Sequence, residues 1–395
     1  MGSLLLLTFL LRYVFVSSAL LNPTDFLALQ SIRKSLHDLP GSSFFSSWDF
    51  TSDPCQFQGV LCDSQNVIAL NLGDPQASSP GLTGRIDPAI GSLSSLTELS
   101  LVPGRVYGSL PASLSGLLSL RFLAISRNFI SGSIPPELSR IRCLKTLDLS
   151  YNQLTGSIPS SIGSIPDLSN VLLCHNKLSG SVPTFGFQAL TRLDLKRNNL
   201  SGTIRPSSLP ASLQYLSLSS NRFTGKVDNL LSQLNQLNYV DLSANRFNGV
   251  IPGSIFSFPI ITLQLQRNAF TGTVQPADQV MIPTVDLSYN RLLGEISPRL
   301  STVQTLYLNN NRFTGRVPGS FVNGLLASTI QTLYLQHNYL TGMPINPTAD
   351  IPSTSSLCLQ YNCMVLPVQS PCPVRVGLQK SRPTDQCIHW KAKGV

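Results

Sequence analysis

One phrase of nine residues returns along most of the chain at intervals of about two dozen residues. Its frame is L-x-x-L-x-L-x-x-N, seen at 144–152 (LKTLDLSYN) and at 237–245 (LNYVDLSAN). A glycine follows four residues after the asparagine, and these glycines occupy twelve positions from Gly84 to Gly342. A regular period of this length predicts a solenoid, in which each unit buries its apolar side against its neighbours. The frame asparagine recurs at Asn128, Asn152, Asn176, Asn198, Asn221, Asn245, Asn268, Asn290, Asn311 and Asn338.

The frame also predicts the local structure of each unit. Because alternate residues of a strand point to opposite sides, the leucines of L-x-L point inward and the intervening residues point outward. One strand per unit stacks into a parallel sheet whose strands lie about 4.8 Å apart. The frame asparagine can bond backbone groups of its own and adjacent units that would otherwise be buried without partners. Phenylalanines two residues after it predict an aromatic spine in the core, at Phe223, Phe247, Phe270 and Phe313.

Residues 1–20 are expected to be a secretory signal peptide. An apolar run over 4–16 precedes small residues at 17–19, which is typical of a signal sequence and its cleavage site. No later segment has the roughly 20 apolar residues needed to span a bilayer. The mature protein is therefore expected to be soluble and secreted to the extracellular space or cell wall, or associated with the outer face of the plasma membrane.

The remaining chain divides into a cap, a repeat array and a second cap. The first coil of a solenoid exposes its apolar interior, so it requires a cover. A helix at the start of the cap, with Thr24 or Asp25 as its N-terminal capping residue, is predicted to supply that cover. The predicted boundaries are 21–66 for the N-terminal cap, 67–345 for about twelve repeats, and 346–395 for a partial repeat, a cysteine-rich cap and a basic tail.

The chain contains eight cysteines. Cys55 and Cys62 are predicted to form a disulfide that staples the N-terminal cap, which an oxidising compartment permits. Cys143 and Cys174 are expected to be free thiols, because their positions on neighbouring strands place them roughly 20 Å apart. The four cysteines of the C-terminal cap can pair in three ways, and the sequence does not choose among them: Cys358, Cys363, Cys372 and Cys387.

The N-terminal cap resembles that of extracellular plant leucine-rich repeat proteins, which reads W…D-x-C-x-W-x-G-V-x-C. The matching residues are Trp48 and the segment 53–62 (DPCQFQGVLC), with Phe57 at the second tryptophan. The repeats resemble the same group, which includes receptor-kinase ectodomains, receptor-like proteins and polygalacturonase-inhibiting proteins. The resemblance implies a leucine-rich repeat solenoid of the α/β horseshoe type with a right-handed superhelix. It further implies a parallel sheet on the concave face and disulfide-stapled caps.

Function is expected on the outward-facing residues of the concave sheet, at six, four, two and one positions before the frame asparagine. Tyrosine, serine, asparagine and glutamine with a few arginines are typical of an adaptable recognition surface. Charge concentrates around the sixth repeat, where paired arginine donors could grip a carboxylate or sulfate. The predicted ligand-binding residues are His175, Arg192, Asp194, Lys196, Arg197, Tyr215, Tyr239, Asp241, Arg267, Tyr307 and Tyr334.

Structural readings compete with these functional ones. The charged sixth repeat can be an ordinary solvated unit, and the tyrosines can be surface residues that stack on neither sugars nor peptides. Aspartates recur on every second repeat, about 10 Å apart, which fits a solvated consensus position better than a catalytic pair. Cys174 beside His175 lacks an orienting third group, so no catalytic residue, metal site or cofactor is predicted. The sequon at 199–201 predicts a glycan on Asn199.

These observations predict a non-enzymatic binding protein. Its formal charge of +9 favours acidic partners, but the basic residues form no block that would bind nucleic acid. We expect it to bind a protein or peptide in extracellular signalling, or to act as a co-receptor for a membrane receptor kinase. The alternative is a cell-wall defence protein similar to polygalacturonase inhibitors, with contact to an acidic cell-wall polysaccharide. Against this alternative, the chain has more repeats than the ten usual in those inhibitors.

Overall fold

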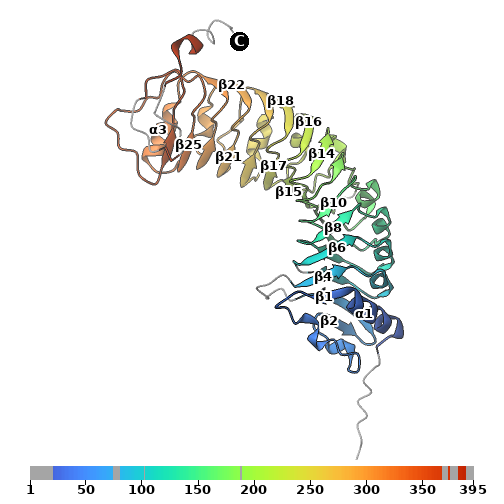
Figure 1. Cartoon of the computed structure of the whole chain (residues 1–395). Coiled ribbons are helices and arrows are strands. Elements are labelled where there is room, and N and C mark those ends of the chain that lie inside the picture. The colour runs from blue at the N-terminus through green and yellow to red at the C-terminus, as the bar shows by residue number, and fades with distance from the viewer. Residues whose placement is uncertain are drawn as a thin grey trace, which may run out of the picture.

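The computed structural model describes residues 21–73, 81–101, 103–186, 189–366, 372–373 and 381–387. These residues form a curved solenoid with the cap helix at one end and the C-terminal residues at the other (Figure 1). The signal peptide predicted for 1–20 lies outside the described residues, as does the end of the basic tail from 388 onward. None of the described helices is both long and apolar enough to cross a membrane.

A sheet of 14 strands lines the inner side of the arc, one strand per repeat. All its strands run parallel except β2, which is antiparallel to β3. The predicted leucine-rich repeat solenoid with a long parallel sheet is therefore confirmed. The strands are, in spatial order, β2 (Val60–Asp63), β3 (Asn66–Leu72), β5 (Glu98–Leu101), β7 (Phe122–Ile125), β9 (Thr146–Asp148), β11 (Asn170–Leu172), β13 (Arg192–Asp194), β15 (Tyr215–Ser217), β17 (Tyr239–Asp241), β19 (Thr262–Gln264), β21 (Thr284–Asp286), β23 (Thr305–Tyr307), β25 (Thr332–Tyr334) and β26 (Ser356–Cys358).

A second set of short strands forms two outer sheets, and most of these strands directly follow the frame asparagines. From here on we call these residues the ladder asparagines. The two outer sheets are separated between β10 and β12, where a single bridge from Ser157 to Ser179 replaces a paired strand. The first sheet contains β1 (Leu36–Asp38), β4 (Leu82–Arg85), β6 (Arg105–Ser109), β8 (Phe129–Gly132) and β10 (Gln153–Leu154). The second contains β12 (Ser179–Gly180), β14 (Asn199–Gly202), β16 (Arg222–Lys226), β18 (Arg246–Gly249), β20 (Ala269–Gly272), β22 (Arg291–Glu295) and β24 (Arg312–Thr314).

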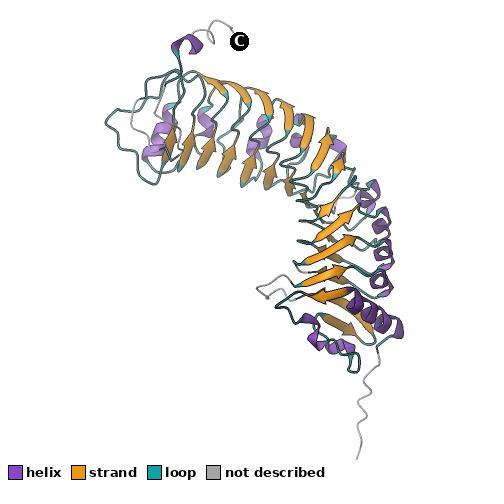
Figure 2. Cartoon of the chain, in the orientation of Figure 1, coloured by secondary structure: helices purple, strands orange, loops and turns teal. Residues whose placement is uncertain are grey.

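Short helices occupy the return segment of most repeats and lie along the outer rim of the N-terminal half of the arc (Figure 2). Most are single 3-10 turns that begin at a proline or directly after one, and the fixed φ of proline suits the start of a helix. The α-helices with defined bounds are α1 (Pro23–Ser35), α2 (Asp228–Gln233) and α3 (Gly319–Leu326). Residues 384–387, at the end of the described part of the chain, are also helical. The described 3-10 helices are η1 (Phe44–Ser47), η2 (Pro54–Gln56), η3 (Pro88–Ser92), η4 (Ala112–Gly116), η5 (Pro136–Arg140), η6 (Ser160–Ser164), η7 (Pro206–Ser208), η8 (Gly253–Ser257) and η9 (Pro298–Leu300).

The N-terminal cap follows the prediction except at the residue that caps its helix. The capping residue of α1 is Asn22, which accepts a hydrogen bond from the backbone N–H of Thr24, so the assignment to Thr24 or Asp25 was wrong. Pro23 explains the shift, because proline is favoured at the first position inside a helix. Asp25 instead accepts the buried N–H of Val67, which ties α1 to the first coil. The predicted Cys55–Cys62 disulfide is present.

The predicted core columns are confirmed. Phe223, Phe247, Phe270 and Phe313 are fully buried, and the first three stack with ring centroids 6.0 and 6.5 Å apart. Each ladder asparagine from Asn152 to Asn338 donates to carbonyls of its own and the preceding coil, and its amide oxygen accepts an N–H of the preceding coil. Because the same bonds recur in every repeat, the chain leaves each inner strand in the same way.

The C-terminal cap resolves the pairing that the sequence left open. Cys358 is bonded to Cys372, and Cys363 is bonded to Cys387. Cys143 and Cys174 are free thiols, as predicted. The first disulfide places residue 372 against the outward column of β26, on the concave side of the last coil.

Candidate ligand-binding site on the concave face

The residue before each ladder asparagine lies in the left-handed backbone region. Its φ is between 52 and 60° in every repeat from Arg127 to Tyr361, although none of these residues is glycine. Left-handed backbone turns the chain sharply at the end of the inner strand. The side chains of this column therefore repeat from one rung to the next at one edge of the concave sheet.

Three members of this column form a stack on adjacent rungs, which we call the His175 stack. The guanidinium of Arg127 lies 4.4 Å from the ring centroid of Tyr151. The Tyr151 and His175 rings are parallel, with centroids 4.0 Å apart. Burial lowers the pKa of His175, and the positive charges of Arg197 and Lys196 lower it further. The imidazole is therefore neutral in the free protein at neutral pH, inside a positive surrounding.

A second stack lies at the opposite edge of the sheet, and we call it the Arg192 stack. The guanidinium of Arg192 lies 4.1 Å from the ring centroid of Tyr215, which stacks on Tyr239 at 4.4 Å. The register of β13, β15 and β17 causes this contact, because it aligns these three residues across the sheet. Burial raises the pKa of both tyrosines, that of Tyr239 to about 12, so both phenols remain protonated and neutral.

Asp194 and Lys196 lie between the two stacks. The Lys196 Nζ is 3.5 Å from an Asp194 carboxylate oxygen, and Asp194 is only 3% exposed. Cys174 is buried on the neighbouring rung, and burial together with the Asp194 charge raises its pKa to about 11. Its thiol is protonated at neutral pH, unlike a reactive cysteine, which needs a lowered pKa. The middle of this rung is thus close to neutral, and positive charge remains at its two edges. Asp148 and Asp241 add negative charge to the same column two rungs away on either side.

The aspartate column has a structural role in these repeats. The carboxylates of Asp148, Asp241 and Asp286 each accept the backbone N–H of the residue two positions later. Asp194 does the same with the N–H of Lys196. These bonds satisfy the backbone N–H groups at the end of the inner strand, where the chain turns into the left-handed residue. The carboxylates are directed at their own chain, and a ligand would have to displace those bonds to reach them.

The structure brings some of the predicted residues together and separates others. His175 and Arg197 lie at one edge of the sheet, while Arg192 lies roughly 15 Å from Arg197 along the same repeat. Arg267 is remote from both and stacks on Tyr289, 4.6 Å from its ring centroid. Tyr307 and Tyr334 meet edge to face at 5.0 Å near the C-terminal end. A single bidentate site made by Arg192 and Arg197 is therefore excluded by their separation.

Two residues of the His175 stack were not among the predicted site residues, namely Arg127 and Tyr151. Both occupy the column directly before the ladder asparagine, so the column register is the signal that relates them to His175. Asn199 is exposed at the start of β14 in the outer sheet, and its side-chain oxygen accepts a bond from Arg222 at 3.5 Å. A glycan there stays a prediction, and its position on the outer sheet would leave the concave strands uncovered.

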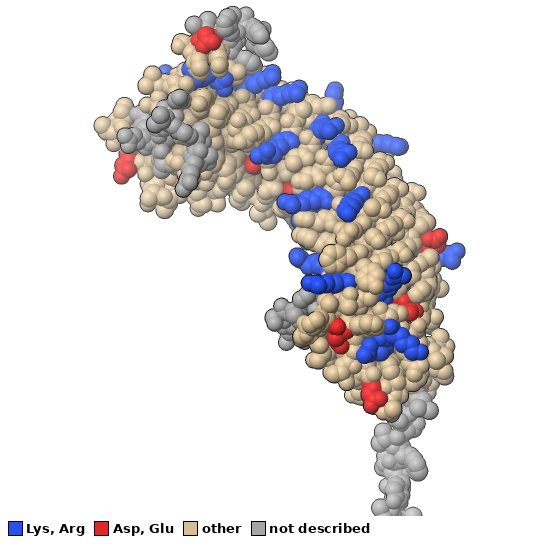
Figure 3. All heavy atoms as spheres, viewed as in Figure 1, with Lys and Arg blue, Asp and Glu red and all other residues tan. Residues whose placement is uncertain are grey.

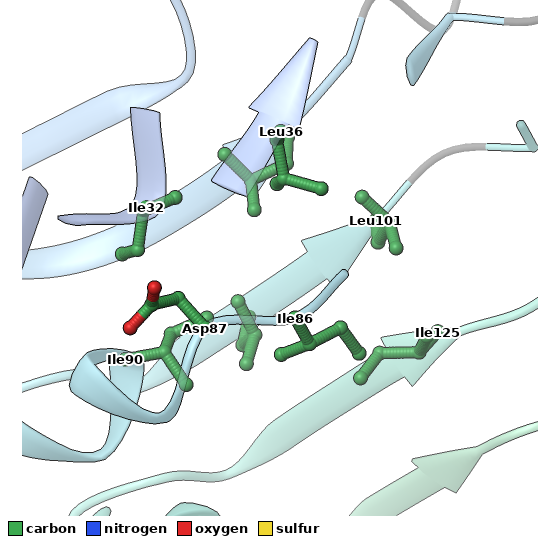
Figure 4. A pocket seen from close by; sticks show the side chains of 9 residues that line it. Ile32, Leu36, Ile86, Asp87, Ile90, Leu101 and Ile125 are labelled. Carbon is green, nitrogen blue, oxygen red and sulfur yellow. The ribbon is translucent and has the colours of Figure 1, made fainter. Parts of the chain in front are cut away.

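The apolar cavity beneath the cap helix does not offer a comparable site. An apolar cavity of about 10 Å³ lies between α1 and the first coils, which leaves room for about one water molecule. Figure 4 shows Ile32, Leu36, Ile90 and Ile125 around it, with Asp87 at its edge. Among the described residues, no group of three histidine, cysteine or acidic side chains could hold a metal ion.

Comparison with known proteins gives the same picture of the fold. Residues 22–63 match the family described as "Leucine rich repeat N-terminal domain". The family described as "Leucine Rich Repeat" matches five units at 119–141, 143–165, 212–234, 236–258 and 302–323.

Two curated relatives come from Arabidopsis thaliana. A probable inactive leucine-rich repeat receptor-like protein kinase is 37% identical over 99 residues, which is 25% of this chain and 13% of the relative. Receptor-like protein 53 is 32% identical over 120 residues, which is 30% of this chain and 12% of the relative. The match thus spans about an eighth of the length of these relatives.

Two solved structures share the fold. A plant peptide hormone receptor, RGFR1 in complex with RGF2, is 30% identical with a TM-score of 0.64, covering 71% of this chain and 50% of that one. A plant ice-binding protein is 26% identical with a TM-score of 0.58, covering 82% of this chain and 97% of that one.

Proposed function

Because this chain is a plant-type leucine-rich repeat protein, related to receptor-like proteins and receptor-kinase ectodomains, we propose that it is an extracellular recognition protein. It is secreted and non-enzymatic, and it binds an anionic segment of a peptide or protein on the concave face across β9 to β17. The role would be extracellular signalling, either directly or as a co-receptor for a membrane receptor kinase. The complex of the similar receptor RGFR1 with RGF2 supports a peptide ligand.

The observation that carries this proposal is the pair of stacks at the two edges of the sheet. An arginine held over a tyrosine ring loses little further conformational freedom when a ligand binds, and its N–H edge stays free for a carboxylate or sulfate. The Asp194–Lys196 pair leaves the middle of that rung close to neutral. Asp148 and Asp241, two rungs away in the same column, disfavour a negative group of the ligand in the middle of the sheet. The geometry suits an extended ligand with two negative groups, one at the Arg192 stack and one near Arg197 and His175.

Selection of binders from a random peptide library displayed with free carboxyl termini tests this proposal. Binders should be enriched in acidic residues, and Arg192→Gln or Arg197→Gln should weaken each selected peptide about 10- to 100-fold, as loss of one charge-assisted hydrogen bond would. Titration calorimetry on the purified chain measures the affinities. Arg222→Gln is the matched control, since Arg222 is an exposed arginine on the outer sheet. If Arg222→Gln weakens binding and Arg192→Gln does not, the site is misplaced.

His175 should make this binding pH-dependent. Its folded pKa is lowered mainly by burial, and Arg197, Lys196 and Arg127 oppose protonation while Asp194 favours it. The pKa of His175 in the folded protein lies below its value of roughly 6.5 in the unfolded chain. The folded protein therefore loses stability as the pH falls from roughly 6.5 through the folded pKa. A bound anion reverses the local potential and raises the imidazole pKa, so binding takes up a proton.

The affinity for an acidic peptide should therefore rise as the pH falls from 7 to 5, and His175→Gln should reduce this dependence. The measurement is the affinity of one selected peptide at three pH values for both proteins. Equal pH slopes in the two proteins would assign the effect to other groups.

The alternative function is inhibition of polygalacturonases with contact to an acidic cell-wall polysaccharide. One observation favours it, a column of exposed arginines directly after the ladder asparagines on the outer sheet, at Arg222, Arg246, Arg291 and Arg312. Basic side chains outnumber acidic ones on this face of the arc (Figure 3). Inhibition of a polygalacturonase by the purified chain, together with no enriched peptide in the selection, would replace the first function with this one.

A further inference from the structure

The last three strands of the concave sheet form a run of adjacent uncharged strands, whereas the uncharged strands β11 and β15 each lie between charged ones. Their outward residues include no aspartate, glutamate, lysine or arginine. By contrast, strand β13 is followed by two basic residues, Lys196 and Arg197. We call the outward surface of the last three strands the C-terminal patch. It consists of Thr305, Tyr307, Asn309 and Asn310 on β23, Thr332, Tyr334, Gln336 and His337 on β25, and Ser356, Gln360 and Tyr361 on β26. Cys358, also on β26, is buried and bonded to Cys372.

Two carboxamide oxygens in this patch have no hydrogen-bond partner among the described residues, namely Oε1 of Gln336 and Oε1 of Gln360. The residues are 5% and 3% exposed, and they lie side by side because Tyr334 pairs with Cys358 across β25 and β26. A buried acceptor without a donor destabilises a fold by about 1–3 kcal/mol. Buried polar groups normally have partners, so two adjacent exceptions indicate that the donors come from another molecule. The terminal torsion of glutamine is soft, so each oxygen can turn toward an arriving donor.

Aromatic rings flank this pair of glutamines on both sides. Tyr307 and Tyr334 meet edge to face at 5.0 Å, and His337 stacks on Tyr361 at 4.6 Å. Burial lowers the pKa of His337, and the charge of Arg382 lowers it further, so its ring is neutral.

Arg382, the cation that acts on His337, is already engaged outside the patch. Its Nε donates to the Asn338 carbonyl, and its guanidinium lies 4.1 Å from the ring centroid of Tyr339. On the other side, the patch ends at β21, which carries the negative charge of Asp286. Burial raises the pKa of Tyr307, and the Asp286 charge raises it further.

We propose that the C-terminal patch is a second binding site, separate from the charged stacks, and that it binds a neutral oligosaccharide. Sugar hydroxyls supply the donors that Gln336 and Gln360 lack, and the C–H faces of pyranose rings pack on tyrosine and histidine rings. A charged peptide segment or a uronate chain would find no counter-charge on these three strands. The Cys358–Cys372 disulfide places residue 372 against the last strand, so the sugar chain would enter from the β21 side.

Titration calorimetry with the complete mature chain tests this proposal, using cellohexaose, mannohexaose and a xyloglucan oligosaccharide as neutral probes and an oligogalacturonide as the charged one. At least one neutral probe should bind. The double variant Gln336→Met/Gln360→Met should weaken that probe about tenfold or more, since two hydrogen bonds are lost. The same variant should melt at an equal or higher temperature, because it removes two buried acceptors that have no partner.

Gln266→Met is the matched control, because Gln266 on the concave face also has an unpartnered Oε1 but lies outside the patch. It should raise the melting temperature in the same way and leave sugar binding unchanged, and Arg192→Gln should also leave it unchanged. No binding of any neutral probe at millimolar concentration would overturn the proposal. So would tighter binding of the oligogalacturonide than of every neutral probe, or equal binding by the double variant and the unaltered chain.

Discussion

Replacement of Asn338 by alanine is expected to lower the free energy of unfolding by about 2–5 kcal/mol. The buried N–H of Phe313 loses its partner, and the carbonyls of Leu308 and Leu335 each lose one of two side-chain donors. The Asn338 side chain is 0% exposed. Its Nδ2 donates to the carbonyls of Leu308 and Leu335, and its Oδ1 accepts the N–H of Phe313, each at 3.0 Å. Alanine cannot replace any of these bonds, and the site is too enclosed for water to enter freely.

The effect of Asn338→Ala should also be local. Each coil of a solenoid contacts only its neighbours, so a defect at one rung weakens the coils beside it. Hydrogen exchange should therefore speed up mainly over β23, β25 and β26, and urea unfolding should show an early C-terminal phase. Asn248→Ala is the control, since Asn248 is exposed on β18 and should change stability by less than about 0.5 kcal/mol. A uniform increase in exchange along the arc, or a change as small as in the control, would contradict this account.

The repeat fold could be predicted from the sequence because each of its columns has one chemical requirement. An inward strand position needs an apolar side chain, and the ladder position needs both a donor and an acceptor, which asparagine supplies. Phe223 and Phe247 could be assigned to the core because they recur at the same offset from Asn221 and Asn245. Such requirements repeat in every coil, so a single chain contains many independent copies of the same evidence.

The geometry of the candidate site was less predictable, because it depends on backbone that leaves no residue signature. Arg127, Tyr151 and His175 have positive φ, yet none is glycine and only histidine belongs to the other residue types enriched in this conformation. Their stacking follows from that backbone and the register of adjacent rungs, which only the structure gives. Likewise, the separation of Arg192 from Arg197 follows from strand direction. The sequence placed both in one repeat, and the structure places them at opposite edges of the sheet.

The hydrogen-bond partners of the outward polar side chains could not be predicted from the sequence either. Asp241 and Gln336 both occupy outward positions of the same sheet. The carboxylate of Asp241 accepts the N–H and hydroxyl of Ser243, whereas the Oε1 of Gln336 has no partner among the described residues. A column pattern predicts which side a residue faces, but the satisfaction of each polar atom depends on distances of a few tenths of an ångström. The pairing of the C-terminal cysteines is the same kind of information.

Phe247→Ala should destabilise the middle of the array by about 3–5 kcal/mol, the usual cost of removing a buried phenylalanine ring. Phe247 is 0% exposed and stacks between Phe223 and Phe270, so two interfaces between coils lose contact at once. Because the defect lies in the middle of the array, it should divide unfolding into two transitions, one for each side. Calorimetry and hydrogen exchange over β16, β18 and β20 measure both effects.

Phe247→Leu is the matched control for this prediction. Leu200 and Leu292 occupy the same column in other repeats and are fully buried there, so the solenoid accepts leucine at this position. The cost should stay below about 1.5 kcal/mol, as for a volume-conserving exchange, and the two transitions should remain merged. Equal destabilisation by alanine and leucine would mean that ring stacking, rather than filled volume, holds adjacent coils together. The four phenylalanines would then stabilise their repeats through ring contacts that the leucines of the same column cannot make.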